Sequence, residues 1–147
     1  MEGESEMTVQ YSRSGKVEHL NPEGLNKNPA FTNVIVVTGN TKTVYVGGQD
    51  ALDADGKLVG KGDLATQVEQ IFKNLETALE AAGATLEHVI KWNIYLVQGQ
   101  SLQIGFGAFQ KIWGQRPNPP AITGFFVAEL ANPDFLAEID AIAVVPQ

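Results

Sequence analysis

The sequence predicts a single α+β domain in which two helices cover one face of a mixed β-sheet. The chain has 147 residues, which is the usual length of one domain. It is 44% hydrophobic and 18% charged, a composition typical of globular proteins and not of disordered ones. Runs of β-branched residues alternate with segments of helical periodicity, and the order of these elements is ββ-α-β-α-ββ.

The N-terminal part precedes the first predicted strand. Residues 1–20 are acidic and polar and are expected to form a flexible arm, which leaves residues 21–147 as the single domain. Two β-branched runs follow, Val34–Val37 and Thr43–Val46, and the loop between them contains glycine and asparagine. Two short runs around such a loop predict a β-hairpin.

The first helix is predicted over residues 63–82. Asp63 is a typical N-cap residue and Gly83 a typical stop residue. The apolar residues between them recur at helical spacing: Leu64, Val68, Ile71, Phe72, Leu75, Leu79 and Ala82. A second helix is expected to begin after Ser101, which can cap it, and to end at Gly114.

Three further strands are predicted, over residues 89–97, 121–130 and 135–145. Right-handed crossovers place both helices on the same face of the sheet. The runs at 34–37 and 141–145 are nevertheless apolar on both sides, which indicates that the opposite face is also buried. We expect oligomerisation to bury it.

The charge and composition exclude several classes of partner. Ten basic residues stand against 17 acidic ones, a net charge of −7, and no two basic residues are adjacent, so nucleic-acid binding is disfavoured. No stretch of 18 apolar residues predicts a membrane span. No complete phosphate, dinucleotide or metal motif occurs, so neither a metal nor a cofactor is expected. The absence of cysteine and of a signal sequence favours the cytoplasm.

Two carboxylates in the last predicted strand are candidates for chemistry. Glu138 and Asp140 are two positions apart, so they point to one face at a separation of about 7 Å. Carboxylates in an apolar row are costly unless they are paired or lie at a cleft. They form either a sheet-edge or salt-bridged pair, or a general acid/base group with a raised pKa that points into a pocket.

Several short segments, each weak alone, occur in an order typical of one family. They are Asn21–Leu25, Asn28–Phe31, the strand end Val44–Gln49, the helix end Glu80–Gly83, Val89–Lys91, Pro119–Ala121 and Glu138–Ala143. At this spacing they resemble the RidA family, also called YjgF or L-PSP.

The resemblance implies a chorismate-mutase-like fold assembled as a homotrimer, with three small-molecule pockets between neighbouring subunits. In active members these pockets hydrolyse reactive imines or enamines and release ammonia and a 2-keto acid. An arginine clamps the substrate carboxylate, and a glutamate on the last strand helps to position or activate water.

The resemblance is uneven at the residues it assigns to the pocket. Ile122 stands where the family has its signature arginine, Gly47 replaces a serine or threonine, Asp140 replaces the glutamate and Phe31 replaces a tyrosine. Isoleucine removes the bidentate fork of the arginine. Each hydrogen bond to a charged group contributes about 1.5–3 kcal/mol, so carboxylate binding is expected to weaken by orders of magnitude.

Asp140 is accordingly the candidate catalytic residue. The candidate ligand-binding residues are Phe31, Gly47, Gly48, Gln49, Asn93, Ile122 and Thr123. The expected function is to bind, or to act as a hydrolase on, a small ligand outside the usual imine substrates. One alternative is a 2-iminobutanoate/2-iminopropanoate deaminase that recruits another anchor, such as Arg116 of a neighbouring subunit. The other is an L-PSP-type endoribonuclease, which the acidic charge and the lack of a suitably placed histidine pair disfavour.

Overall fold

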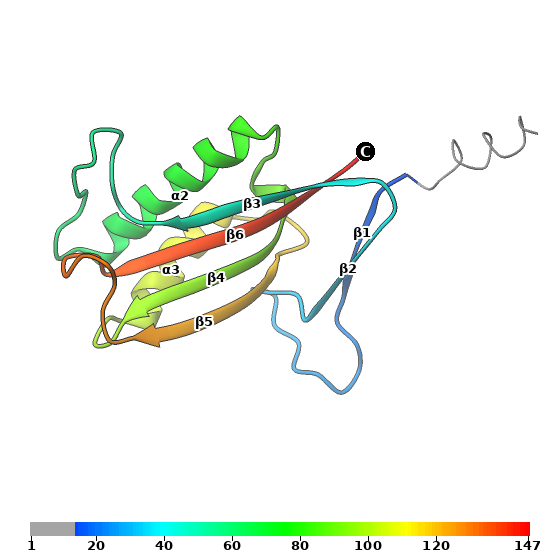
Figure 1. Ribbon diagram of the computed structural model, residues 1–147. Coiled ribbons are helices and arrows are strands. Elements are labelled where there is room, and N and C mark those ends of the chain that lie inside the picture. The colour runs from blue at the N-terminus through cyan, green and yellow to red at the C-terminus, as the bar shows by residue number, and fades with distance from the viewer. Residues whose placement is uncertain (1–13) are drawn as a thin grey trace, which may run out of the picture.

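The computed structural model of the chain describes residues 14–147. Its elements in chain order are β1 (Lys16–Leu20), β2 (Val34–Thr38), β3 (Thr41–Gln49), α2 (Leu64–Ala81), the short 3₁₀ helix η1 (Leu86–His88), β4 (Val89–Val97), α3 (Leu102–Trp113), β5 (Ala121–Val127) and β6 (Ala137–Pro146). Four strands form the main sheet in the order β3-β6-β4-β5, and β1 and β2 form a separate two-stranded sheet (Figure 1).

The main sheet is mixed, and both α-helices lie on one of its faces (Figure 1). Strands β4 and β5 are parallel, which requires the crossover that α3 supplies, whereas β6 is antiparallel to both of its neighbours. This arrangement confirms the predicted α+β class and the predicted placement of both helices. The predicted element order is also confirmed from β2 onward, and β1 adds a strand before it.

The helix boundaries follow from their caps, as predicted. The side chain of Asp63 accepts a hydrogen bond from the backbone N–H of Thr66, and Ser101 accepts one from Ile104, each at 3.2 Å. Gly114 follows α3 with a φ of 64°, a backbone conformation that favours glycine. These local signals mark where α2 and α3 begin and where α3 ends.

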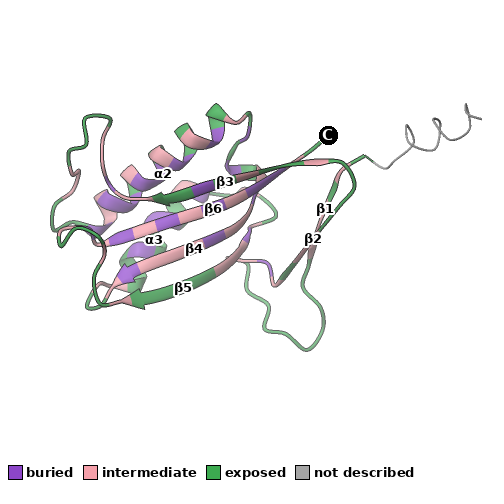
Figure 2. Ribbon diagram, in the orientation of Figure 1, coloured by how far each residue is buried: buried purple, intermediate pink, exposed green. Residues whose placement is uncertain are grey.

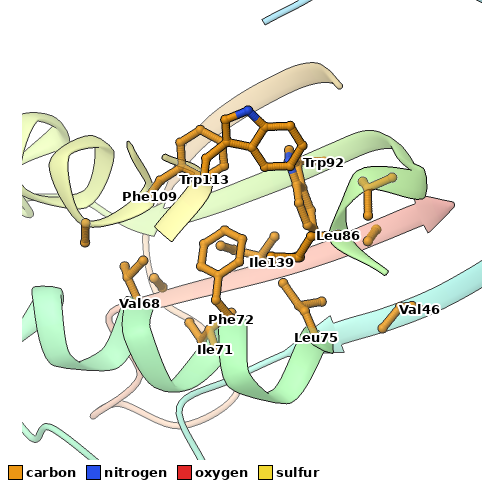
Figure 3. Packing of buried hydrophobic residues seen from close by; sticks show 14 of the residues in the cluster. Val46, Val68, Ile71, Phe72, Leu75, Leu86, Trp92, Phe109, Trp113 and Ile139 are labelled. Atoms are coloured by element: carbon orange, nitrogen blue, oxygen red, sulfur yellow. The ribbon is translucent and has the colours of Figure 1, made fainter. Parts of the chain in front are cut away.

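The core lies between the two helices and the sheet. Phe72 of α2 meets Trp92 of β4 edge to face, with ring centroids 5.3 Å apart, and both side chains are fully buried. Figure 3 shows these rings beside Phe109 of α3 and Ile139 of β6. Burial of each such side chain stabilises the fold by about 1.5–3 kcal/mol. This packing holds the helices on one face and leaves the other face of the sheet uncovered within the protomer.

The predicted hairpin between Val34–Val37 and Thr43–Val46 is wrong. Strand β2 pairs with β1, and β3 pairs with β6 at the edge of the main sheet. Gly39, with a φ of 80°, lies between β2 and β3, and Asn40 accepts a hydrogen bond from the backbone of Gln147. The two adjacent strands therefore pair with different neighbours, because long-range pairing of β3 with β6 competes with the local hairpin.

The flexible arm that was expected over residues 1–20 does not extend to residues 16–20. Residues 16–20 form β1, in antiparallel register with β2 from Lys16 opposite Thr38 to Leu20 opposite Val34. Residues 1–13 lie outside the described part of the chain. Over residues 14–147 no helix has both the length and the apolar character needed to span a bilayer.

Candidate functional site

The face of the sheet opposite the helices carries most of the candidate residues. Alternate residues of a strand point to opposite faces, so burial of Trp92 and Ile139 in the core sends Asn93 and Asp140 to the open face. Figure 2 shows exposed stretches along β3 and β5, the two edge strands of this sheet. The site is therefore built on rigid strands and opens towards solvent in the protomer.

Asp140 is the centre of a hydrogen-bonded group on this face. Its carboxylate accepts one bond from Asn93 Nδ2 at 2.9 Å and another from the hydroxyl of Tyr95 at 3.1 Å. Asn93 lies directly opposite Asp140 in the β4–β6 register, which brings the two side chains within reach. Both donors are neutral, so they fix the orientation of the carboxylate without cancelling its charge.

Tyr95 is held in place from two sides. Its ring stacks on Phe125 of β5, with centroids 5.1 Å apart and planes 12° apart. Desolvation and the hydrogen bond to Asp140 raise the pKa of Tyr95 above its usual value of 10.0, so the hydroxyl remains a donor at neutral pH. The sequence analysis did not select Tyr95. Its position two residues after Asn93 on the same strand was the signal that could have found it.

The carboxyl group of Asp50, just past the end of β3, lies beside Glu138 of β6. A Cβ at Gly48 would lie 2.1 Å from Glu138 Oε2, so a larger residue there would displace the carboxylate of Glu138 from this position. Asp50 lies beside Glu138, and its Oδ1 atom is buried without a hydrogen-bond donor among the described residues. Two carboxyl groups can share a hydrogen bond only when one of them carries a proton.

Burial, together with the neighbouring Glu138, raises the pKa of Asp50 from 3.8 to about 7. Asp50, a residue that the sequence analysis missed, is therefore a candidate acid/base group on this face. A glycine at position 48 and an acidic residue just past the strand end were the available signals. Among residues 14–147, none of the ion pairs involves Glu138 or Asp140, so the structure does not support the ion-pair alternative.

Three other candidates lie at the rim of the open face. Thr123 of β5 accepts a hydrogen bond from Lys91 Nζ of β4, next to Asn93. Gly47 has open space where a side chain would be, and the half-buried Gln49 donates from Nε2 to the Gly47 carbonyl at 3.2 Å. The β3–β6 register shifts between Val46 and Gln49, as at a β-bulge.

Ile122 and Phe31 lie elsewhere. Ile122 is in register with the buried Trp92 and therefore faces the helices, away from Asp140. It lines an apolar pocket of about 230 Å³ between α3 and β5, and Phe31 lines the same pocket. The neighbouring Thr32 holds this loop by donating to the carbonyl of Pro119. One protomer thus does not bring Ile122 and Asp140 into one cavity.

Arg116, the alternative carboxylate anchor, is engaged at the C-terminus of α3. Its Nη1 donates to the carbonyls of Ile112 at 2.7 Å and Trp113 at 3.0 Å. Its guanidinium also lies 5.8 Å from the centroid of the Trp113 ring. These contacts complete the helix end, where a cation is favourable. No group of three acidic or histidine side chains in the described part of the chain could hold a metal ion.

The raised pKa of Asp50 gives a testable pH dependence. The folded state binds more protons than the unfolded state between pH 3.8 and about 7, so the free energy of unfolding falls as pH rises through this range. Asp50→Asn removes this titrating carboxyl group, so the free energy of unfolding should fall less as pH rises. We expect the variant to exceed the natural chain in stability at pH 8 and to lose that advantage near pH 4, measured by urea unfolding.

Asp55→Asn is the matched control, because Asp55 is exposed in the following turn. It should leave the pH dependence unchanged. An Asp50→Asn variant with the same pH slope as the natural chain would contradict the raised pKa of Asp50.

Comparison with known proteins identifies the family to which this fold belongs. Residues 26–145 match the family described as Endoribonuclease L-PSP. A 2-iminobutanoate/2-iminopropanoate deaminase of Rattus norvegicus is 31% identical over 117 residues, which cover 78% of this chain and 80% of that protein. A RutC family protein of Pyrococcus horikoshii is 32% identical over 100 residues, 68% of this chain and 77% of that protein.

A solved structure shows the same fold. The crystal structure of a Rid family protein of unknown function from Yersinia pestis superposes with a TM-score of 0.77 at 29% identity, over 88% of this chain and 98% of that one. Sequence and structure therefore agree that this chain belongs to the L-PSP family, the RidA or YjgF family that its motifs resemble.

Proposed function

We propose that this chain forms a homotrimer whose small-molecule sites lie between neighbouring subunits, and that these sites take a ligand without an arginine-clamped carboxylate. The observation that carries the proposal is the separation of Ile122 from Asp140. The sheet lies between their side chains, and the pocket that Ile122 lines does not include Asp140. A site that uses both residues therefore needs the face of a second subunit.

The uncovered face of the sheet supports the assembly. Tyr45 on β3 is 77% exposed and Phe125 on β5 is 43% exposed, although both are large aromatic residues. The two rings lie on the opposite edge strands of this face, and exposed apolar side chains of this size favour an interaction site there. A second copy that packs on this face would bury these rings and close the polar group around Asp140 into a cleft.

The ligand class follows from the missing cation. Ile122 offers no hydrogen bond, and Arg116 already serves the end of α3. A ligand carboxylate placed beside Ile122 would lose its water without gaining a charged partner. Imines that bear a carboxylate should therefore bind weakly.

Asp140 is the group best placed for chemistry. Asn93 and Tyr95 hold its carboxylate on the open face, where it can accept a proton from a water molecule. That water would add to the carbon of a C=N bond, the nitrogen would take up the protons, and the C–N bond would break to give a carbonyl compound and ammonia. The acid of the Asp50 and Glu138 pair lies on the same face as a proton donor.

A second candidate is the 2-iminobutanoate/2-iminopropanoate deaminase activity itself. The relatives of that name in rat and human support it, at 31% and 29% identity. An endoribonuclease is disfavoured, because the net charge of −7 and the carboxylates of the open face would repel a phosphate backbone. The cytoplasmic location expected from the composition stays a prediction.

Assembly is the first test. Sedimentation at micromolar protein concentration should give a species of three times the chain mass of 15.8 kDa, because the open face cannot remain exposed. A stable monomer at that concentration would remove the inter-subunit site from the proposal.

The loss of the arginine is tested in a coupled assay, in which an amino-acid oxidase generates imines and ammonia release is followed. We expect the natural chain to add little to the uncatalysed rate. Ile122→Arg should raise kcat/KM for carboxylate-bearing imines by about tenfold or more, since a bidentate pair is restored. Ile122→Val is the control that changes size without adding charge. Rapid turnover by the natural chain would favour the deaminase instead.

The role of Asp140 is tested in the variant that has gained activity. Adding Asp140→Asn to Ile122→Arg keeps the Asn93 and Tyr95 neighbours but removes the proton acceptor. The double variant should remain a folded trimer and lose the gained turnover. Unchanged turnover would exclude Asp140 as the base, and loss of the trimer would make it a structural residue.

A further inference from the structure

The apolar pocket between α3 and β5 differs in its lining from the polar site on the open face of the sheet. Every residue that lines its volume of about 230 Å³ is apolar or glycine. Val68, Phe109 and Ile139, which Figure 3 shows in the core, belong to its lining. Phe126 and Leu102 at its rim are 52% and 60% exposed. The pocket is therefore a break in the hydrophobic core that opens to the surface.

Two glycines keep this pocket open. Gly124 lies in the middle of β5, where glycine weakens a strand, and a Cβ built on it meets no atom within 4 Å. Gly105 is buried in the middle of α3, and its Cβ would contact Leu64 and Leu96 at 3.6 and 3.7 Å. A glycine inside a helix costs about 0.5–1 kcal/mol relative to alanine. The fold thus carries two destabilising residues whose missing side chains leave room at one place.

The size of the pocket sets the size of its occupant. An apolar cavity of about 150 Å³ binds benzene, so this volume suits an apolar group of about six to ten non-hydrogen atoms. A charged group would be desolvated here with no partner, because no lining residue carries a charge or a side-chain hydrogen-bonding atom. Only uncharged groups are compatible with this lining.

The pocket adjoins the polar site around the edge of the sheet. Phe125 of the edge strand β5 lines the pocket and stacks on Tyr95, which donates to Asp140. We propose that the pocket takes an uncharged aromatic or branched aliphatic group of the ligand, of about six to ten non-hydrogen atoms. This inference deepens the proposed function and rests on it for the role of the pocket as part of the ligand site.

A matched pair of probes tests the inference. Benzyl alcohol and benzoate have nearly the same size and differ in charge, and their binding can be measured by NMR titration of the labelled protein. We expect benzyl alcohol to shift the resonances of the pocket residues and benzoate to bind at least about tenfold more weakly, because its charge loses water. Equal binding of the two probes, or no binding of benzyl alcohol, would overturn the inference.

Gly124→Val fills the pocket from a position where the backbone tolerates a side chain. It should weaken benzyl alcohol binding by about tenfold or more, since the added carbons occupy the space of the ring. Gly124→Ala is the milder variant should valine prevent folding. Gly107→Ala is the matched control, because Gly107 is exposed on α3 and its Cβ would point into open space. Binding unchanged by Gly124→Val would place the probe elsewhere.

The outcome separates this inference from the proposed function. Asp55→Asn should not change benzyl alcohol binding, because Asp55 is exposed in a turn and does not line the pocket. If the trimer or the turnover gained by Ile122→Arg is not found while Gly124→Val still blocks the probe, the proposed function fails and the apolar pocket stands. If the trimer and the gained turnover are found but Gly124→Val has no effect on the probe, only the pocket inference fails.

Discussion

The alternation of side chains along four strands is the constraint on which the rest of this structure depends. Both helices pack on one face, so alternate residues of β4 from Trp92 onward and of β6 from Ala137 to Ala143 belong to the core, and the residues between them face away from it. Trp92 anchors the first set through Phe72, and Asp140 belongs to the second. A shift of one residue in either strand would exchange the two sets, so the packing of the core also fixes the composition of the site.

The Asp140 carboxylate on the open face is held by donors that carry no charge. Asn93 and Tyr95 orient Asp140, and no cation of the described residues neutralises it. At the end of β3, Asp50 meets Glu138 with an unpartnered oxygen, which favours a bound proton. Such an arrangement costs stability in the protomer and leaves two carboxyl groups available to a ligand or to a neighbouring copy.

The helix side of the sheet gives the opposite environment. Ile122, Gly124 and Phe31 form part of a wholly apolar pocket, where the family resemblance implies an arginine at position 122. An apolar pocket selects by size and by the absence of charge, whereas an arginine selects by bidentate hydrogen bonding. In the function proposed above, the chain keeps a carboxylate on the open face, and its apolar pocket changes the class of ligand.

The sequence by itself determined the elements whose signals are local. The caps Asp63 and Ser101, the apolar stripe of α2 and the β-branched runs fixed both helices and strands β2 to β6, and the ordered motifs identified the family. Only the tertiary structure decided which strands pair and which side chains meet. Strand β2 pairs with β1, and Tyr95 of β4 contacts Asp140 of β6. The raised pKa of Asp50 likewise depends on Glu138, which is distant in the sequence. Local propensity carries no information about such contacts, because their free energy arises only when distant segments exclude water together.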